Sequence, residues 1–288
     1  CFPPYIGGTG EDPDGTYPGD NICTRFNMSG RVSLLPYYEG QQIFDRAKAN
    51  NFGPRPWRRF RNVWRVRIPT LVCPSDEELR NFCGNASYHF CLGTSVFRTH
   101  EAGGATWDNG EWAPDGVYTQ LGPTHNVDNR NAAKMRKMRD IRDGTSNTIA
   151  MSEKRIGVLL PGLNRWRDVA NNAVIPLTRP DRGQPRPTTT ELYNTCFVVA
   201  NLTNGKRYND SGIELLEYTT PETPRHTGWR NGKRWADGRP YYNCFTTIVP
   251  PNGPSCILND DPDSRNGIIA ASSRHPNIVL AAKADGSV

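Results

Sequence analysis

Glycine and proline interrupt this chain so often that long helices have little room. The 288 residues include 27 Gly and 24 Pro, distributed along the whole length. Proline lacks a backbone donor and glycine loses the most conformational freedom on folding, so both types favour turns over regular elements. We therefore predict short strands and many turns, in a chain long enough to bury a substantial core as one domain with insertions or as two small ones.

Local patterns place one helix and several strands. The best helical candidate lies within residues 34–50, where 41–49 favours a helix. Short strands are predicted near 60–72, 87–97, 116–121 and 145–152, and residues 192–202 also have a strand-like pattern. The basic run 134–139 is expected to be a solvated face that leads into a strand at Ile141 or just after it.

The last residues predict a strand and a tight hairpin. Residues 278–282 form a short apolar run, which is typical of a buried strand. Asp285 and Gly286 then offer the two positive-φ positions that a two-residue type I′ turn prefers. A returning strand is therefore expected to begin at the very end of the printed sequence.

The densest positive charge lies in one predicted strand, within a chain of net charge +6. With a period of two, Phe60, Trp64, Val66 and Ile68 share one face and Arg59, Arg61, Arg65 and Arg67 share the other. We expect the apolar face to join the core and the arginines to protect a sheet edge from unwanted pairing. An anionic polymer or an acidic neighbouring subunit is the alternative ligand for these arginines, whereas nucleic acid is disfavoured because the aromatic rings face the core.

The cysteine content indicates an oxidising compartment. The eight cysteines are Cys1, Cys23, Cys73, Cys83, Cys91, Cys196, Cys244 and Cys256, an even set without a Cys-x-x-Cys pair. Such a set favours up to four disulfides over a zinc ribbon or a redox site. The connectivity stays open, with a preference for the local closures Cys244–Cys256 and Cys73 with Cys83 or Cys91. The alternative is that some of them are buried free thiols.

Two groups of residues resemble possible metal ligands. Residues 259–267 place Asp260, Asp261 and Asp263 before a glycine, and oxygen ligands in such a loop suit calcium. The spacing is not that of an EF-hand, and aspartates in turns often only cap the backbone. A transition-metal site at Cys83, His89 and Cys91 is disfavoured, because their spacing fits no familiar zinc pattern.

Signatures of enzymes are missing from the sequence. It has no Gly-x-Ser-x-Gly elbow, no His-Glu-x-x-His helix, no Walker loop and no dinucleotide fingerprint. His275 could serve as a general base in a hydrolase, but a base needs a nucleophile and an orienting group. We instead expect His275 to bind a loop carbonyl or a carboxylate and so to pin the C-terminal hairpin. The chain is predicted not to be an enzyme.

Five motifs in a fixed order resemble a known family. They are Phe2-Pro3-Pro4; Leu34 to Glu39 with Gln41 and Gln42; Cys73-Pro74-Ser75-Asp76; Asp143-Gly144-Thr145-Ser146-Asn147-Thr148 with Glu153; and His275 followed after nine residues by Asp285-Gly286. Together they resemble domain-of-unknown-function family 1559, prepilin-like surface proteins abundant in planctomycetes. Residues 157–263 match no motif of that family and are interpreted as an insertion elaborating a single domain over residues 1–288.

The resemblance implies a fold and a role. Members of this kind look like type IV pilins and pseudopilins, with an apolar N-terminal helix and an α+β head built on an antiparallel sheet. The chain opens at Cys1 without an apolar run long enough to span a membrane, so we expect a head without its helix. A lipid-modified Cys1 is a weaker alternative. The implied role is a structural subunit of an extracellular pilus-like filament, exported by a pilin-type pathway, with other copies or other pilin-like subunits as partners and disulfides stapling its long loops.

A surface binding module is the competing hypothesis. Polysaccharide or another extracellular ligand would stack on aromatic side chains, and the candidate platforms are Trp107, Trp112, Trp166, Trp229 and Trp235. Tryptophan more often belongs to a core or an interface. The two hypotheses are distinguished by whether these rings are exposed.

Overall fold

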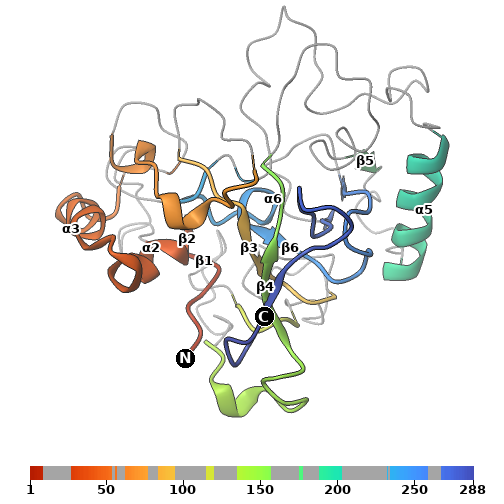
Figure 1. The fold of residues 1–288 in the computed structure, drawn as a ribbon, viewed down its shortest axis with the longest axis horizontal. Coiled ribbons are helices and arrows are strands. Elements are labelled where there is room, and N and C mark those ends of the chain that lie inside the picture. The colour runs from red at the N-terminus through yellow and green to blue at the C-terminus, as the bar shows by residue number, and fades with distance from the viewer. Residues whose placement is uncertain are drawn as a thin grey trace, which may run out of the picture.

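The fold was described from a computed structural model (Figure 1). It describes residues 1–8, 27–53, 56, 62–76, 84–94, 115–119, 135–156, 175–177, 188–202, 232, 234–258 and 267–288. Within these ranges the fold is α+β, and most elements are short, as the glycine and proline content predicts. None of the helices in these ranges is long and apolar enough to cross a membrane.

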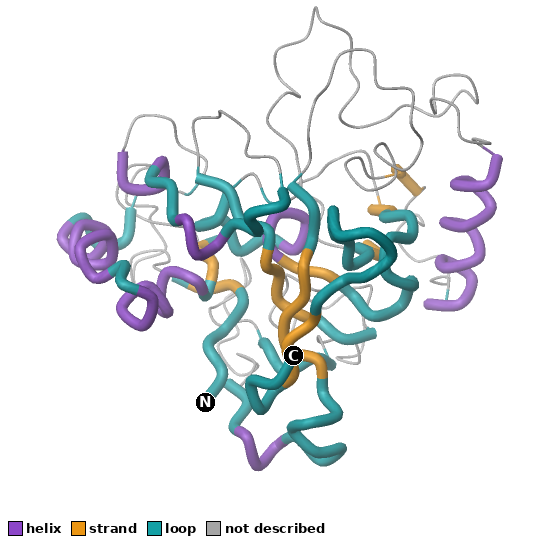
Figure 2. Tube along the Cα trace, in the orientation of Figure 1, coloured by secondary structure: helices purple, strands orange, loops and turns teal. Residues whose placement is uncertain are grey.

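A mixed four-stranded sheet lies near the middle of the described structure (Figure 2). Its strands are β3 (Tyr88–Cys91), β4 (Ile149–Glu153), β6 (Cys244–Phe245) and β9 (Ala281–Lys283), in the spatial order β6-β3-β4-β9. β4 pairs antiparallel with both β3 and β9, whereas β6 is parallel to β3. The predicted strands near 87–97 and 145–152 are therefore confirmed, although both are shorter than expected.

Apolar side chains cover both faces of this sheet. Residues opposed in register share a face, so Phe90 and Cys244 point one way while Cys91 and Phe245 point the other way. The first face packs with Tyr5, Ile6, Leu92, Val117, Tyr118 and Ala284, and the second packs with Ile269, Ala271 and Val279. Because the sheet is covered on both sides, buried polar residues on its strands need internal partners.

A second core lies in the N-terminal part of the chain. Here β1 (Ile6–Gly7) pairs with β2 (Met28–Ser29), and α2 (Arg31–Leu34), the 3-10 turn η1 (Leu35–Tyr38) and α3 (Gln41–Ala49) follow. Val32, Leu35, Trp64 and Trp235 pack together in this core. Glu39 takes a left-handed φ of 63° and ends η1, so α3 starts as a separate helix. The predicted helix over 41–49 is confirmed.

A three-stranded sheet and the longest described helix form the remaining elements. β5 (Ile175–Leu177), β7 (Cys256–Leu258) and β8 (Gly267–Ile268) form the sheet in the order β5-β7-β8, and α5 spans Thr189–Leu202. The prediction of a strand over 192–202 is wrong. Thr188 and Glu191 form a capping box, in which the Thr188 Oγ1 accepts the Glu191 N–H at 3.2 Å and the Glu191 carboxylate accepts the Thr188 N–H at 2.6 Å.

The predicted strand over 60–72 is also wrong. Two 3-10 turns occupy its described part, η2 (Asn62–Arg65) and η3 (Pro69–Leu71). Val63 and Trp64 are adjacent and both buried, and a strand cannot turn two neighbours to the same face. Arg65 is half-buried and Arg67 is exposed, so these two do not share one solvated face, and Arg59 and Arg61 lie outside the described residues.

Two other predicted strands are replaced by irregular backbone. Residues 115–119 have no strand, although the Thr119 carbonyl accepts the Tyr5 N–H at 2.9 Å. Met138–Asp140 forms a 3-10 turn, and the chain then turns again through 142–147 before β4 begins at Ile149. The strand expected at Ile141 is therefore wrong, because the turn motif that follows it delays extended structure by eight residues.

The C-terminal hairpin exists with a different turn. The Gly286 N–H donates to the Lys283 carbonyl at 3.0 Å, and the Lys283 N–H donates to the Ser287 carbonyl at 2.8 Å. Gly286 has a φ of 88°, whereas Asp285 does not adopt positive φ. This is a three-residue loop with a type I turn and glycine at the left-handed position, not the predicted type I′ turn. The preceding run is not buried either, since Ile278 is 55% and Leu280 is 46% exposed.

The disulfide predictions are corrected at several cysteines. Cys196 in α5 pairs with Cys256 in β7, so the predicted closure Cys244–Cys256 is wrong. Cys73, Cys91 and Cys244 are buried free thiols, and Cys1 is an exposed one. Cys91 and Cys244 lie on neighbouring strands but on opposite faces, which explains why they do not bridge. Cys23 and Cys83 lie outside the described residues, as does the predicted calcium loop with Asp260, Asp261 and Asp263.

Candidate functional site

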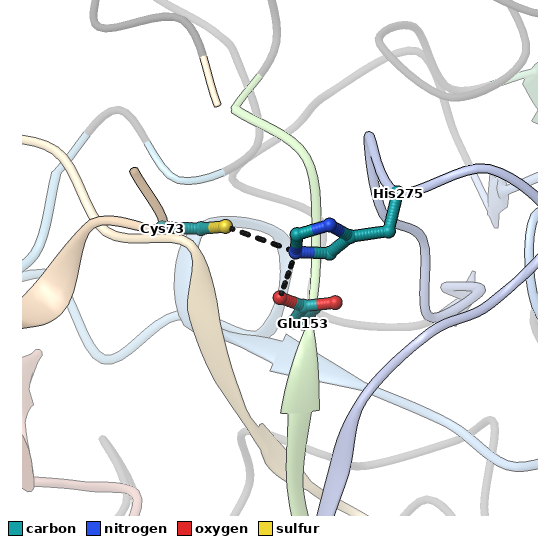
Figure 3. A group of neighbouring side chains, drawn as sticks. All are labelled: Cys73, Glu153 and His275. Carbon is teal, nitrogen blue, oxygen red and sulfur yellow. Dashed lines mark hydrogen bonds and ion pairs between the residues drawn. The ribbon is translucent and has the colours of Figure 1, made fainter. Parts of the chain in front are cut away.

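Three family-motif residues that are far apart in the sequence meet at one point (Figure 3). Cys73 follows η3, Glu153 ends β4, and His275 lies in the loop before β9. The Nε2 atom of His275 is 3.5 Å from the Cys73 Sγ and 3.3 Å from the Glu153 Oε1. Figure 3 shows the sulfur, the ring nitrogen and the carboxylate oxygen pointing toward one another. We call these three residues the Cys-Glu-His cluster.

The Cys73 motif forms a turn that presents a second carboxylate beside the cluster. The Asp76 N–H donates to the Cys73 carbonyl at 2.9 Å, which closes the turn over Pro74 and Ser75. The Asp76 Oδ2 then accepts the Ser87 hydroxyl at 2.9 Å and the Ile156 N–H at 2.7 Å. Its Oδ1 accepts the Arg274 Nε at 3.2 Å. Asp76 therefore joins the residue before β3 and the segment after β4 to the loop that carries His275.

Glu153 holds the C-terminal strand against β4. Its Oε2 accepts the Leu280 N–H at 3.1 Å, and its backbone N–H donates to the Leu280 carbonyl at 3.0 Å. Its own carbonyl accepts the Ser272 N–H at 3.0 Å. The side chain is only 4% exposed, so these contacts and His275 replace the solvation that a buried carboxylate loses.

His275 lies at the more open side of the cluster. Its backbone N–H donates to the Ser273 Oγ at 3.1 Å, and its side chain is 29% exposed. The expectation that His275 contacts a carboxylate is confirmed by Glu153, whereas its role in pinning the C-terminal hairpin stays a prediction. The sequence did not indicate which carboxylate, because Glu153 precedes His275 by more than a hundred residues.

Charges of both signs lie beside the cluster. Arg274 is paired with Asp76, and both line the cavity that Cys73 and Glu153 also line. Tyr88 lies close enough to hydrogen-bond to Cys73, and partial burial, followed by the nearby Cys73 and Glu153, raises the pKa of its phenol above the usual value. The site is therefore a compact network of charges with little contact with solvent.

The geometry of the cluster differs from that of a nucleophile relay. In a relay the histidine uses one nitrogen for the nucleophile and the other for the carboxylate, whereas here Nε2 faces both Cys73 and Glu153. The adjoining cavity, lined by Cys73, Asp76 and Glu153 among others, has a volume of about 10 Å³. That is room for one water molecule or one ion, whereas small-molecule substrates occupy pockets of roughly 300 Å³ or more.

Two further motifs meet at the opposite end of the β4–β9 pair. Gly144 has a φ of 86° and its carbonyl accepts the Asn147 N–H at 3.0 Å and the Thr148 hydroxyl at 3.0 Å, so Asp143 to Thr148 form the turn that enters β4. The Thr148 carbonyl accepts the Ala284 N–H at 2.8 Å, next to the Asp285-Gly286 hairpin. Because β4 and β9 are antiparallel, motifs distant in sequence become neighbours at each end of this strand pair.

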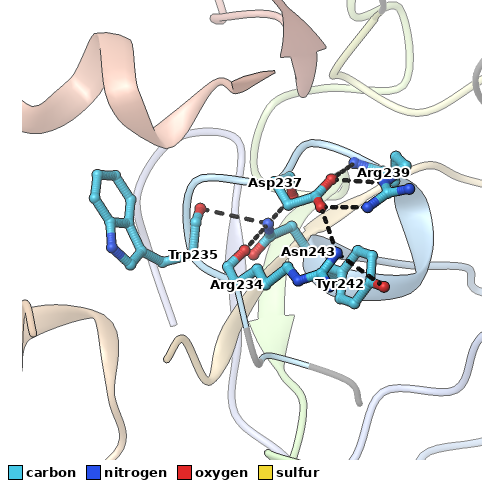
Figure 4. Close-up of polar contacts among 6 residues, drawn as sticks. All are labelled: Arg234, Trp235, Asp237, Arg239, Tyr242 and Asn243. Atoms are coloured by element: carbon cyan, nitrogen blue, oxygen red, sulfur yellow. Dashed lines mark hydrogen bonds and ion pairs between the residues drawn. The ribbon is translucent and has the colours of Figure 1, made fainter. Parts of the chain in front are cut away.

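The structure contains a second buried polar network that the sequence did not predict (Figure 4). Arg239 makes two bonds to the fully buried Asp237, Nε to Oδ1 at 2.9 Å and a terminal nitrogen to Oδ2 at 2.7 Å. Arg234 reaches the same carboxylate at 3.4 Å and stacks over Tyr242, and Asn243 donates to the backbone carbonyls of this loop. Its only sequence signal was the aromatic and basic composition of residues 229–242, which does not say which charges pair.

Part of residues 157–263 belongs to the main body of the described structure. β6 is a strand of the central sheet, and Trp235 packs against Trp64 at a ring separation of 5.8 Å. Trp235 is fully buried and its indole N–H donates to the Val66 carbonyl at 3.1 Å, so it is not the predicted stacking platform. The other candidate platforms, Trp107, Trp112, Trp166 and Trp229, lie outside the described residues.

Comparison with known proteins agrees with the motifs. The model of a family described as proteins of unknown function, DUF1559 (SBP_bac_10), matches residues 1–288. No curated protein and no solved structure matches the chain. The match spans residues 157–263 as well, although no motif was recognised there from the sequence. This chain therefore belongs to DUF1559, a family whose function is unknown.

Proposed function

We propose that this chain is a structural protein, the head of a pilin-like subunit that packs with copies of itself or with related subunits in an extracellular filament. The observation that carries the proposal is that the motif carboxylates bind groups within the chain itself. Asp76 and Glu153 direct their buried oxygens at groups of this same chain, and they fasten the C-terminal segment to the sheet. Such a motif preserves a shape, which is what a subunit of an assembly needs.

The small size of the cavity at the motif cluster also supports a structural role. A volume of about 10 Å³ admits a water molecule or an ion but excludes an organic substrate. The proposal therefore includes no catalytic step at Cys73, Glu153 or His275.

The exposed side chains beside β9 provide a surface for assembly. β9 pairs only with β4 in the described part of the central sheet, so it forms an edge there. Ile278 and Leu280 precede it and are 55% and 46% exposed, and Ile149 on β4 is 38% exposed. Apolar side chains beside a sheet edge favour contact with another molecule. We propose that subunits pack through this surface, outside the cell.

Electron microscopy of native, non-reduced surface material containing this chain tests the proposal, with mass spectrometry to locate the natural N-terminus. Ordered filaments built from the chain are the expected result. The double variant Ile278→Asp with Leu280→Asp should abolish filaments and leave the unfolding midpoint of the isolated chain unchanged. Tyr37→Asp is the matched control, because Tyr37 is 85% exposed and lies in η1, away from β9. Monodisperse particles from native material would contradict a filament subunit.

A further inference from the structure

We propose that Cys73, Glu153 and His275 together bind one divalent transition-metal ion, with zinc as the best-matched ion. The Sγ, Oε1 and Nε2 atoms lie within 4.8 Å of one another. They come from three segments that the fold brings together, and each is the terminal polar atom of its side chain (Figure 3). The inference is independent of filament assembly, because it concerns only the interior of one subunit.

The chemistry of the three atoms favours a cation between them. A thiolate sulfur, a carboxylate oxygen and an unprotonated imidazole nitrogen each present a lone pair and no proton. The single Nε2 nitrogen of His275 faces both the Cys73 sulfur, at 3.5 Å, and the Glu153 carboxylate oxygen, at 3.3 Å. A metal ion satisfies all three lone pairs at once. Two negative ligands also balance the charge of a divalent ion, while the nearby Arg274 is already paired with Asp76.

Two of the three separations between the ligand atoms match those of a tetrahedral zinc site, and the third, between Sγ and Oε1, is within 4.8 Å. Zinc binds sulfur at about 2.3 Å and nitrogen or oxygen at about 2.0 Å. At tetrahedral angles these bond lengths place sulfur and nitrogen about 3.5 Å apart and nitrogen and oxygen about 3.3 Å apart. The observed separations are 3.5 Å and 3.3 Å.

The surroundings resemble the outer shell of a metal site. The second oxygen of Glu153 is held by the Leu280 N–H, which leaves Oε1 directed at His275. Tyr88 can donate its hydroxyl to the Cys73 sulfur, and the Cys73 carbonyl accepts the Asp76 N–H, so the ligand turn is fixed. Such outer contacts orient ligands and raise metal affinity. The adjoining cavity of about 10 Å³ has room for a water molecule as the fourth ligand.

The ligand set selects the type of ion. Calcium and magnesium prefer six or more oxygen ligands, which this cluster does not provide. One sulfur, one nitrogen and one oxygen suit a borderline ion such as zinc. The bound ion would join η3, β4 and the loop before β9, and it would protect the Cys73 thiol from oxidation in a compartment where Cys196 and Cys256 form a disulfide.

Cobalt(II) is the probe that tests the site, because a thiolate bound to cobalt gives a near-ultraviolet charge-transfer band and four-coordinate cobalt absorbs in the visible. The full chain, purified and stripped of metal with a chelator, should bind one cobalt with both signals, and added zinc should remove them. Cys73→Ser should abolish the charge-transfer band. His275→Gln and Glu153→Gln should weaken binding by about ten-fold or more. The amide oxygen that Glu153→Gln introduces can still accept the Leu280 N–H, so this variant keeps that contact with the C-terminal segment.

Cys1→Ser is the matched control, because it removes an exposed free thiol away from the cluster and should leave both signals unchanged. Circular dichroism checks that each variant is folded. A folded wild-type chain that shows no charge-transfer band would overturn the proposal without reference to any variant. Persistence of the band in folded Cys73→Ser would overturn it as well, since the thiolate would then come from another cysteine.

Discussion

Replacing Asp76 with alanine removes the acceptor of three hydrogen bonds at once. The carboxylate of Asp76 is 3% exposed and accepts the Ile156 N–H, the Ser87 hydroxyl and the Arg274 Nε. The three donors come from different segments, so the change should loosen the contact between the sheet and the C-terminal loop.

The loss can be estimated donor by donor. Ile156 is fully buried, and an unsatisfied buried N–H costs about 1–3 kcal/mol. The Ser87 hydroxyl can rotate, so its loss is near the lower end of that range, about 1 kcal/mol. Arg274 is 22% exposed and keeps contact with water, so its share is at most about 1 kcal/mol. We expect Asp76→Ala to lower the free energy of unfolding by about 2–5 kcal/mol, a large part of the roughly 5–15 kcal/mol typical of a folded protein.

Urea denaturation of the full chain measures this loss of stability. The slope of the unfolding free energy against urea concentration should stay unchanged, which shows that the same surface is exposed on unfolding. Asp143→Ala is the matched control, because Asp143 is the exposed aspartate of another family motif and should change stability by less than about 0.5 kcal/mol. A loss below about 1 kcal/mol for Asp76→Ala would refute the reasoning that its buried oxygens hold the fold together.

Three other changes have distinct expected outcomes. Arg31→Met should stabilise the protein by about 1–3 kcal/mol, because burial lowers the pKa of Arg31 to about 10. The charged form is therefore less stable in the core than in water, and the contact with Phe90 offsets only part of this cost. Changing Cys196 and Cys256 to serine should cost about 4 kcal/mol, because the disulfide spans 60 residues. His89 is buried and its pKa lies well below 6.5, chiefly through burial, so it is neutral in the folded state. Stability should therefore fall as the pH drops below about 6.5, by up to about 1.4 kcal/mol per pH unit, and His89→Asn should flatten this slope.

The same urea assay checks all three. Destabilisation by Arg31→Met would mean that the guanidinium, which has no hydrogen-bond partner within the described residues, stabilises the core more than its desolvation costs. Equal midpoints with and without a reductant would contradict the disulfide estimate. If the free energy of unfolding of His89→Asn falls between pH 7 and pH 5 as steeply as that of the wild type, other groups govern the acid sensitivity.

Local chemistry explains which elements could be predicted. The helix over 41–49 was predictable because its helix-favouring residues lie within one short window. The helix that begins at Thr189 was missed, although Thr188 and Glu191 have the spacing of a capping box in the sequence itself. The tight turn at the C-terminus was predictable from Asp285 and Gly286, but its type depends on the register of β9, which local residues do not determine.

By itself, the sequence determined the membership of the family, the abundance of short elements and the residues of each motif, because these depend on residue types and their spacing. Only the tertiary structure decided that Cys73, Glu153 and His275 share one point, since the antiparallel pairing of β4 with β9 brings the last two segments together. It also decided that Cys196 pairs with Cys256 while Cys73 remains a thiol. Neighbours in space come from strand register and the packing of both sheet faces, and these involve residues that are 60 to 202 positions apart in the sequence.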